Sequence, residues 1–127
     1  PGASRVLVGG LVVYADAAKS RLAGLDADLV AREGAVSPAV TEALARAACE
    51  RTGADWGVAV TGVAGPGPLA APDGTELPAG TCHWAVRGPD GTVHVEGRRL
   101  TGDRAAVRER LGSAALDLLR RVLGDGG

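Results

Sequence analysis

Lys19 is the residue whose type and position most directly suggest chemistry. It is the only lysine in a chain of 127 residues with fourteen Lys and Arg together. An ammonium group can lose its proton in a suitable site, whereas a guanidinium cannot, so a lysine can act as a general base. If Asp16 caps a helix, Lys19 lies in the first helical turn, where the dipole disfavours a cation and favours the neutral amine. A solvated lysine whose flexible stem escapes the dipole fits the same spacing.

Tyr14 lies five residues before Lys19, at the carboxyl end of an apolar segment that reads as a strand. Ligands of α/β sheets gather at the carboxyl ends of strands. We therefore expect the Tyr14 hydroxyl to face the same cleft as Lys19 and to donate to the lysine or to a reacting oxygen. A tyrosine that closes the core and leaves its hydroxyl in water is the alternative.

The segment from Thr61 to Gly67 places three glycines directly after a second apolar strand. Backbone N–H groups in such a turn can approach an anion or an amide closely. The segment lacks the Gly-Lys-Ser/Thr ending of a P-loop, and no helix follows it, as a dinucleotide fingerprint would require. An ordinary glycine-proline turn is the alternative.

Arg104 stands at the front of the last predicted helix, where a cation again opposes the helix dipole. A guanidinium there is suited to bidentate binding of a phosphate or carboxylate. Arg108, one turn later, fits a solvated basic face instead. His83 and His94 alternate with apolar residues and have neither an acidic partner nor metal-ligand spacing, so we expect them to pack or to lie at the surface.

These residues need a scaffold, and apolar periodicity and turn residues predict one. Residues 5–14 predict a buried strand, and helices are expected over 17–22 and 26–32. Ser37-Pro38 predicts the start of a helix that ends at Gly53, followed by a strand over 55–61 and a proline-rich loop to Pro78. Strands over 80–87 and 92–100 form a hairpin, and a final helix runs from Asp103 to Gly124. This order predicts an α/β fold, a three-layer α/β/α domain with a mixed β-sheet, over residues 1–127.

Composition excludes several classes of function. The net charge of −1 argues against a nucleic-acid or anionic-membrane binder, because phosphate binding needs clustered basic residues. Apolar runs fall short of the roughly 20 residues that span a bilayer. Cys49 and Cys82 match no metal spacing, so we expect two buried free thiols and a cytoplasmic protein. The chain has no Met, so we expect that Pro1 is not the translation start.

Several short motifs occur here in a specific order. They are Pro-Gly-Ala-Ser, Gly-Gly-x-Val-x-Tyr, the lysine five residues on, Gly-Ala-Val-Ser, Val-Thr-Gly-Val-Ala-Gly-Pro-Gly and Gly-Asp-Arg-x-x-Val-Arg. Together they resemble the CinA C-terminal domain family, from Pro1 to about Leu123. The motifs over 60–67 and 102–108 are the most specific parts of the resemblance.

The resemblance implies a nicotinamide-nucleotide amidohydrolase. Such an enzyme converts nicotinamide mononucleotide into nicotinic acid mononucleotide and ammonia by acyl transfer through a serine, without a metal or cofactor. The family's serine lies in a Glu-Ser-Cys-Thr-Gly-Gly-like motif, which this sequence lacks. Its expected place is upstream of Pro1, together with a strand and a helix of the domain.

The resemblance also implies roles for individual residues. Lys19 matches the lysine that activates the serine, and Tyr14 the tyrosine beside it. The implied substrate-binding residues are Ser4 near the nucleophile, Thr61, Gly62, Ala64 and Gly65 in the cradling turn, and Arg104 for the phosphate.

One departure and two open questions accompany these expectations. Between Tyr14 and Lys19 the family usually has Ser-Asn-Glu-Ala, whereas this chain has Ala-Asp-Ala-Ala. Polar groups that would position a substrate are therefore fewer. The alternative function is a non-catalytic module of this family that binds a nucleotide or a protein partner. Members of the family often form dimers, so the resemblance also allows a homo-oligomer.

Overall fold

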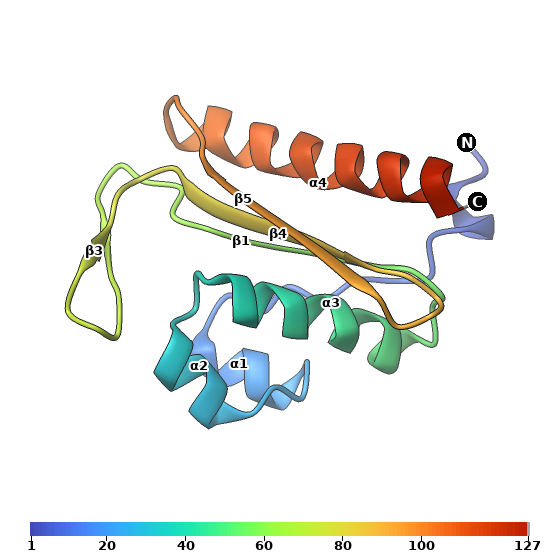
Figure 1. Ribbon diagram of the computed structural model, residues 1–127, viewed down its shortest axis with the longest axis horizontal. Coiled ribbons are helices and arrows are strands. Elements are labelled where there is room, and N and C mark those ends of the chain that lie inside the picture. Colours follow the sequence, from blue (N-terminus) through green and yellow to red (C-terminus); the bar gives the residue numbers. More distant parts are fainter. Residues whose placement is uncertain (127) are drawn as a thin grey trace.

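Two helical layers enclose a small β-sheet in the computed structural model, which describes residues 1–126 (Figure 1). Helix α3 covers one face of the sheet, with α2 packed against α3 and α1 against α2, and the long helix α4 covers the other face. The elements, in chain order, are the 3₁₀ helix η1 (Ala3–Arg5), α1 (Asp16–Arg21), α2 (Ala27–Glu33), α3 (Pro38–Thr52), β1 (Gly57–Gly62), β2 (Leu69–Ala70), β3 (Glu76–Leu77), β4 (Thr81–Arg87), β5 (Val93–Arg99) and α4 (Arg104–Gly126).

The main sheet has the strand order β1-β4-β5, and each neighbouring pair is antiparallel. The predicted hairpin is confirmed, because β4 and β5 are joined by the turn at residues 88–91. Asp90 fixes this turn: its carboxylate accepts from the Thr92 backbone N–H at 2.9 Å and from the Thr92 hydroxyl at 3.0 Å. These two bonds also lower the pKa of the Asp90 carboxyl.

Helix α3 begins and ends where the sequence predicts. The Ser37 hydroxyl accepts from the Val40 N–H at 3.3 Å, and Gly53 ends the helix with a φ of 76°. Its apolar face packs on the sheet, and this core contains Val40, Leu44, Ala45, Ala47, Ala59 and Ala85. The helix approaches β1 so closely at Gly57 that a Cβ there would overlap the Ala45 carbonyl.

Helix α4 begins at Arg104, after Asp103 caps it by accepting from the Ala106 N–H at 2.9 Å. The predicted helix is confirmed, and its apolar side packs on the opposite face of the sheet. This second core contains Cys82, Trp84, Val86, Val107, Leu111, Ala115 and Leu118. The helix continues to Gly126, past the predicted end at Gly124.

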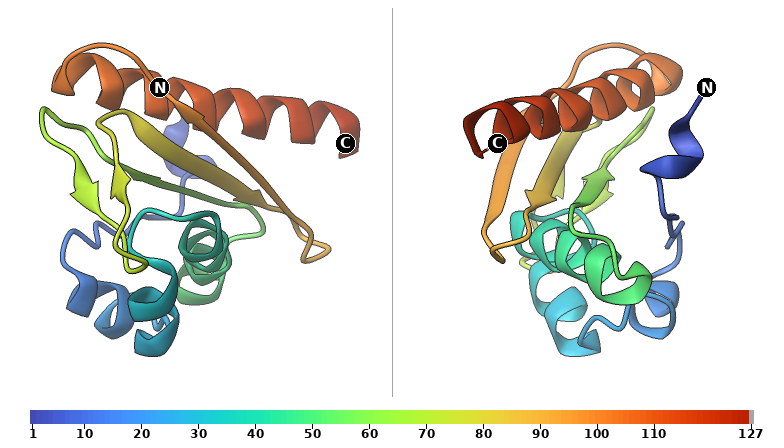
Figure 2. Two further views of the ribbon diagram at one scale, coloured as in Figure 1. Left: turned by 60° about the vertical axis from the view of Figure 1, so that its left-hand side comes forward. Right: turned by 90° about the vertical axis from the view of Figure 1, so that its right-hand side faces the viewer.

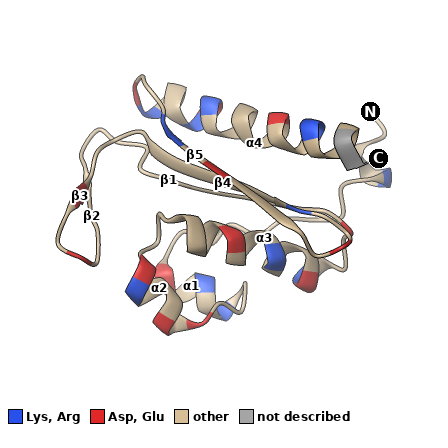
Figure 3. Cartoon of the chain, viewed as in Figure 1, with Lys and Arg blue, Asp and Glu red and all other residues tan. Residues whose placement is uncertain are grey.

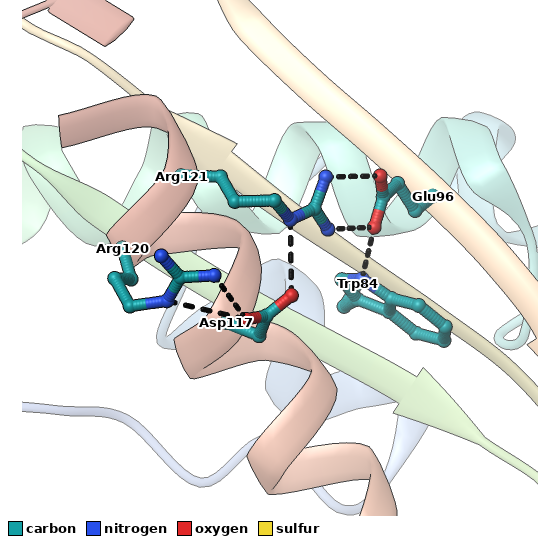
Figure 4. Close-up of polar contacts among 5 residues, drawn as sticks. All are labelled: Trp84, Glu96, Asp117, Arg120 and Arg121. Atoms are coloured by element: carbon teal, nitrogen blue, oxygen red, sulfur yellow. Dashed lines mark hydrogen bonds and ion pairs between the residues drawn. The ribbon is translucent and has the colours of Figure 1, made fainter. Parts of the chain in front are cut away.

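A polar cluster ties α4 to strand β5 (Figure 4). Arg121 donates to both oxygens of Glu96, at 2.7 and 3.0 Å, and to Asp117 at 3.0 Å. Trp84 donates its indole N–H to Glu96 at 3.0 Å. The Arg121 guanidinium is the main reason why the pKa of the Glu96 carboxyl lies below its usual value. The sheet and α4 are therefore joined by charge as well as by apolar contact.

The prediction of a buried strand over residues 5–14 is wrong. After η1 the chain runs to Tyr14 without strand pairing, and Val6, Val12 and Tyr14 are more than 80% exposed. The segment lies beyond β1, at the sheet edge opposite β5 (Figure 2, right). Its valines and leucines have the composition of a strand, but among the described residues it has no paired neighbour against which to bury them.

The proline-rich loop expected up to Pro78 contains a short hairpin, β2–β3, that extends away from the main sheet. Asp73 supports its turn by accepting from the Thr75 backbone N–H and from the Thr75 hydroxyl. The hairpin reaches the end of α2, where Pro72 lies so close that a Cβ on Gly34 would be 2.9 Å from its Cδ. Local prolines and glycines predicted corners here but not the pairing between them.

The α/β class and the layers of helices on both faces are confirmed. The sheet is antiparallel among the described strands rather than mixed, because residues 5–14 add no strand to it. Acidic and basic side chains are interspersed along α3 and α4 (Figure 3). Within residues 1–126, no helix is both long and apolar enough to cross a membrane.

Candidate functional site

Arg104 connects two of the other predicted site residues. Its Nη2 donates to the Tyr14 hydroxyl at 3.1 Å, and its Nη1 donates to the Gly65 carbonyl at 3.1 Å. The three residues come from the extended N-terminal segment, the turn after β1 and the first residue of α4. Both partners of the guanidinium are uncharged, and no carboxylate in the described chain forms an ion pair with it. Its positive charge therefore remains available to an anion.

The turn after β1 exposes backbone donors beside this arginine. The Val63 N–H donates to Thr81 and belongs to the sheet edge. The N–H groups of Ala64, Gly65 and Gly67 find no acceptor among residues 1–126, and Gly65 has a φ of 93°. Because the Gly65 carbonyl is held by Arg104, the turn is fixed while its donors stay free. Such an arrangement suits an oxyanion, a phosphate or a carboxamide oxygen.

Close packing at Gly62 requires a glycine there, independently of the substrate-binding role that we expect for it. A Cβ on this residue would lie 3.0 Å from both Cys82 Sγ and Leu111 Cδ2. The glycine lets β1 end close against β4 and α4. The position of the turn at 63–67 therefore depends on the absence of a side chain at Gly62.

Lys19 is buried, with a relative exposure of 6%. Its Nζ donates to the Val13 carbonyl at 3.0 Å and lies 3.6 Å from Asp16 Oδ1. The lysine therefore binds the backbone one residue before Tyr14, which places its amine beside the tyrosine segment. A solvated lysine is excluded by this burial.

The expected helix-dipole effect on Lys19 is not supported. Helix α1 has six residues and is capped by Ala15, so Asp16 is its first residue and Lys19 belongs to its last turn. In so short a helix the first and last turns overlap, and no net dipole effect on the amine follows. The immediate surroundings of Lys19 are instead a carbonyl, a carboxylate and the burial of the side chain.

Thr61 takes part in a buried hydroxyl pair that sequence reasoning missed. Thr61 Oγ1 lies 2.8 Å from Thr41 Oγ1, and the Thr41 hydroxyl donates to the Ser37 carbonyl at 2.6 Å. A hydroxyl carries one proton, so Thr61 must be the donor to Thr41. Thr61 can then only accept a hydrogen bond from a ligand. The spacing of Ser37 and Thr41, one helical turn apart after a cap, was the available signal.

Asp16 lines two neighbouring hollows. One, of about 190 Å³, lies between α1 and α2, and the other, of about 320 Å³, lies between α1, α2 and the β2–β3 hairpin. Both are also lined by Val30 and Ala31. None of the residues predicted to bind substrate lines either hollow, but Asp16 joins them to Lys19 through its ion pair.

Ser4 is not brought to the other predicted residues. Helix η1, which carries it, lies near the C-terminal end of α4, whereas the turn after β1 lies near the opposite end of the molecule (Figure 1). Nine residues separate Ser4 from Tyr14, and after η1 they run as irregular chain from that end of the molecule toward α1. The expectation that Ser4 lies near the site therefore has no support in this arrangement.

Both cysteines are free and buried, as predicted, and burial raises the pKa of the Cys82 thiol. His83 is opposite Thr61 in the β1–β4 pairing, and burial lowers the pKa of its imidazole. Its ring packs over Gly97, where a Cβ would meet Nδ1. Within residues 1–126, no three His, Cys, Asp or Glu side chains form a group that could hold a metal.

Known proteins are similar to this chain over nearly its whole length. The family model described as the CinA C-terminal domain matches residues 1–123. A "CinA-like protein" of Mycobacterium sp. (strain JLS) is 52% identical over 126 residues, which cover 98% of this chain and 29% of the relative. A "CinA-like protein" of Anaeromyxobacter sp. (strain K) is 51% identical, with 97% of this chain and 29% of the relative covered. The chain thus spans under a third of the length of these curated relatives.

Solved structures are similar in fold. The competence-damaged protein (CinA) superfamily protein KP700603 from Klebsiella pneumoniae 700603 superposes with a TM-score of 0.82 at 31% identity. That match covers 91% of this chain and 69% of the other. The CinA superfamily protein ECK1530/EC0983 from Escherichia coli gives a TM-score of 0.79 at 32% identity, with 87% and 62% covered.

Proposed function

Because the chain belongs to the CinA C-terminal domain family, we propose that it supplies the general base and the substrate-binding groups of a nicotinamide-nucleotide amidohydrolase. The reaction converts nicotinamide mononucleotide and water into nicotinic acid mononucleotide and ammonia. The proposal places the nucleophilic serine upstream of Pro1, in a cytoplasmic protein. The observation that carries it is the link from Arg104 to both Tyr14 and Gly65.

In this proposal Arg104 binds the phosphate of the nucleotide. Arg104 is the first residue of the long helix α4, and the two protein partners of its guanidinium are neutral. A dianionic phosphate at this position would gain charge-assisted hydrogen bonds as well as the N-terminal end of the helix dipole. The Tyr14 hydroxyl and the Gly65 carbonyl orient the guanidinium before the substrate arrives.

Lys19 acts as the base in the proposed acyl transfer. The serine oxygen attacks the carboxamide carbon while its proton passes to the Lys19 amine. The resulting ammonium returns a proton to the amide nitrogen as the carbon–nitrogen bond breaks, so ammonia leaves and an acyl-serine remains. Water then attacks the acyl carbon and gives a proton to Lys19. The bond to the serine oxygen breaks and Lys19 returns the proton to that oxygen, so the acid is released and both serine and base are restored.

The turn at 64–65 stabilises the charge that develops in this reaction. The free N–H groups of Ala64 and Gly65 are suited to the oxyanion formed at the carboxamide oxygen. Thr61, at the end of β1, holds the strand to α3 and thereby fixes where the turn begins. These groups are already fixed in the fold.

The test is ammonia release from nicotinamide mononucleotide by the longer encoded protein that contains this chain. Reading the sequence before Pro1 comes first, since the proposal requires a serine at a strand-glycine turn there. Lys19→Arg keeps the positive charge but cannot act as a base, so we expect a loss of at least about 100-fold in kcat. Arg21→Ala, on the same short helix but exposed, is the matched control and should stay within about twofold of the parent.

Either of two results would overturn this assignment. Absence of the upstream serine would contradict the hydrolase activity. Near-normal turnover by a folded Lys19→Arg variant would contradict the role of Lys19 as the base. Nucleotide binding without ammonia release would favour the non-catalytic module, for which the Ala-Asp-Ala-Ala departure before Lys19 is the supporting observation. Circular dichroism establishes that each variant retains its helices.

A further inference from the structure

The larger hollow beside Asp16 combines one carboxylate with apolar walls. It has a volume of about 320 Å³ and is bounded by α1, α2 and the β2–β3 hairpin. Its walls include Val30, Ala31, Leu69 and Pro72, and Asp16 is its single charged lining residue. A flat apolar group that carries one positive charge matches this chemistry.

Asp16 links the hollow to the proposed base, Lys19, which itself lines neither hollow. Asp16 Oδ1 lies 3.6 Å from Lys19 Nζ, so one carboxylate belongs both to the surroundings of the amine and to the wall of the hollow. A carboxamide within reach of Lys19 would have its ring attached directly to the reacting carbon. The ring would then lie within one ring width of Asp16.

We propose that Asp16 is a specificity-determining residue that recognises the positive charge of the pyridinium ring of the substrate, with the ring seated in the apolar hollow between α2 and the β2–β3 hairpin. The inference rests on the proposed function, because it uses Lys19 to place the carboxamide. Asp16 lies in the Ala-Asp-Ala-Ala segment, where this chain departs from the motif usual in the resembling family.

Charge balance in the bound state supports this role. Without substrate, the counter-ion of Asp16 is the Lys19 ammonium. A pyridinium next to Asp16 takes the place of that counter-ion. The product ring carries a carboxylate in place of the carboxamide, and Asp16 repels that group, which favours release.

Binding can be measured without turnover. The longer encoded protein, with its proposed upstream serine changed to alanine, is titrated by calorimetry with nicotinamide mononucleotide and with its neutral analogue, a benzamide ribonucleoside 5′-phosphate. For the parent chain we expect a lower Kd for the cationic ligand. Asp16→Asn should raise the Kd of nicotinamide mononucleotide about fivefold, the size of one partly screened ion pair, and leave the neutral analogue within about twofold.

Two further variants locate the effect. Asp28→Asn removes the same charge from an exposed residue of α2 that lines neither hollow, and it should change neither Kd. Ala31→Leu fills the hollow from an exposed helical position, so it should weaken both ligands by about tenfold without disturbing the fold.

The outcomes separate this inference from the enzyme assignment. Equal affinity of the parent for both ligands, an equal loss of both in Asp16→Asn, or unchanged binding in Ala31→Leu would each overturn ring recognition by this hollow. A charge preference that depends on Asp16 would stand even if the longer protein released no ammonia, in which case only the hydrolase would be lost. Ammonia release without any charge preference would support the hydrolase and contradict ring recognition by Asp16.

Discussion

Arg104 donates to the hydroxyl of Tyr14 at 3.1 Å across 90 positions of sequence. The contact joins the first residue of the last helix to the segment that precedes the first. Neither residue contributes a compensating negative charge, so the contact orients a cation without neutralising it. This distinguishes Arg104 from Arg121, whose guanidinium forms ion pairs with Glu96 and Asp117.

Arg104→Ala should raise the KM for nicotinamide mononucleotide by about 10- to 100-fold in the longer encoded protein, the range for loss of a charged hydrogen-bonded partner. The effect should shrink for the nucleoside that lacks the phosphate, because that substrate has nothing for the guanidinium to bind. Steady-state kinetics with both substrates measure the difference. Arg108→Ala, one turn further along α4, removes the same charge and should be nearly neutral. Equal losses on the two substrates would remove the phosphate contact.

The Thr41–Thr61 pair should reveal its donor direction in stability measurements. Thr41→Val leaves Thr61 with a buried hydroxyl and no acceptor, so we expect a loss of about 2 kcal/mol in the free energy of unfolding. Thr61→Val leaves the Thr41 bond to Ser37 intact and should cost about 1 kcal/mol or less. Urea unfolding of both single variants and the double variant measures the coupling. Thr61→Val as the costlier change would contradict the assigned direction.

Much of the fold could be predicted because its signals are local. The cap at Ser37, the glycine at Gly53 and the Asp-Gly turn at 90–91 each act within a few residues, and the structure has all three. The segment 5–14 was predicted wrongly because a strand requires a partner, and a run of valines cannot specify one. Strand formation is a property of a pair of segments.

The candidate site, too, could be predicted only in part from the sequence. Tyr14, Gly65 and Arg104 were found through motif order, and the structure brings them together. Asp16 was interpreted only as a cap, because its ion pair with Lys19 and its place in the hollow depend on how α1 packs. The Thr41–Thr61 contact was missed because the two residues lie 20 positions apart, one on a helix and one on a strand.

Glu96 should make the stability of the protein dependent on pH. Its folded-state pKa is lowered, chiefly by Arg121, so the stabilisation is present above its unfolded value of about 4.5 and is lost as the pH falls through the lower folded value. Glu96→Gln should therefore cost about 1 kcal/mol at pH 7, since the pair is partly exposed, and almost nothing at pH 2.5. Tryptophan fluorescence, from Trp56 and Trp84, during urea unfolding measures this. Glu42→Gln, in an exposed pair with Arg46, should show a smaller difference between the two pH values; a constant cost of Glu96→Gln at both would contradict the role of charge.

Two glycine-to-alanine changes should have opposite signs. Gly57 lies where β1 touches α3, and a Cβ there would overlap the Ala45 carbonyl and lie 2.8 Å from Cys49 Sγ. Backbone and helix must move apart to admit it, so we expect Gly57→Ala to destabilise the fold by about 2–3 kcal/mol. Gly112 is exposed within α4 with no atom near its would-be Cβ, and alanine there should stabilise by up to about 1 kcal/mol through higher helix propensity. Thermal unfolding followed by circular dichroism compares the two. A neutral Gly57→Ala would show that α3 and β1 are not in such close contact in solution, and the sheet edge that carries Thr61 would then be less firmly fixed than the site requires.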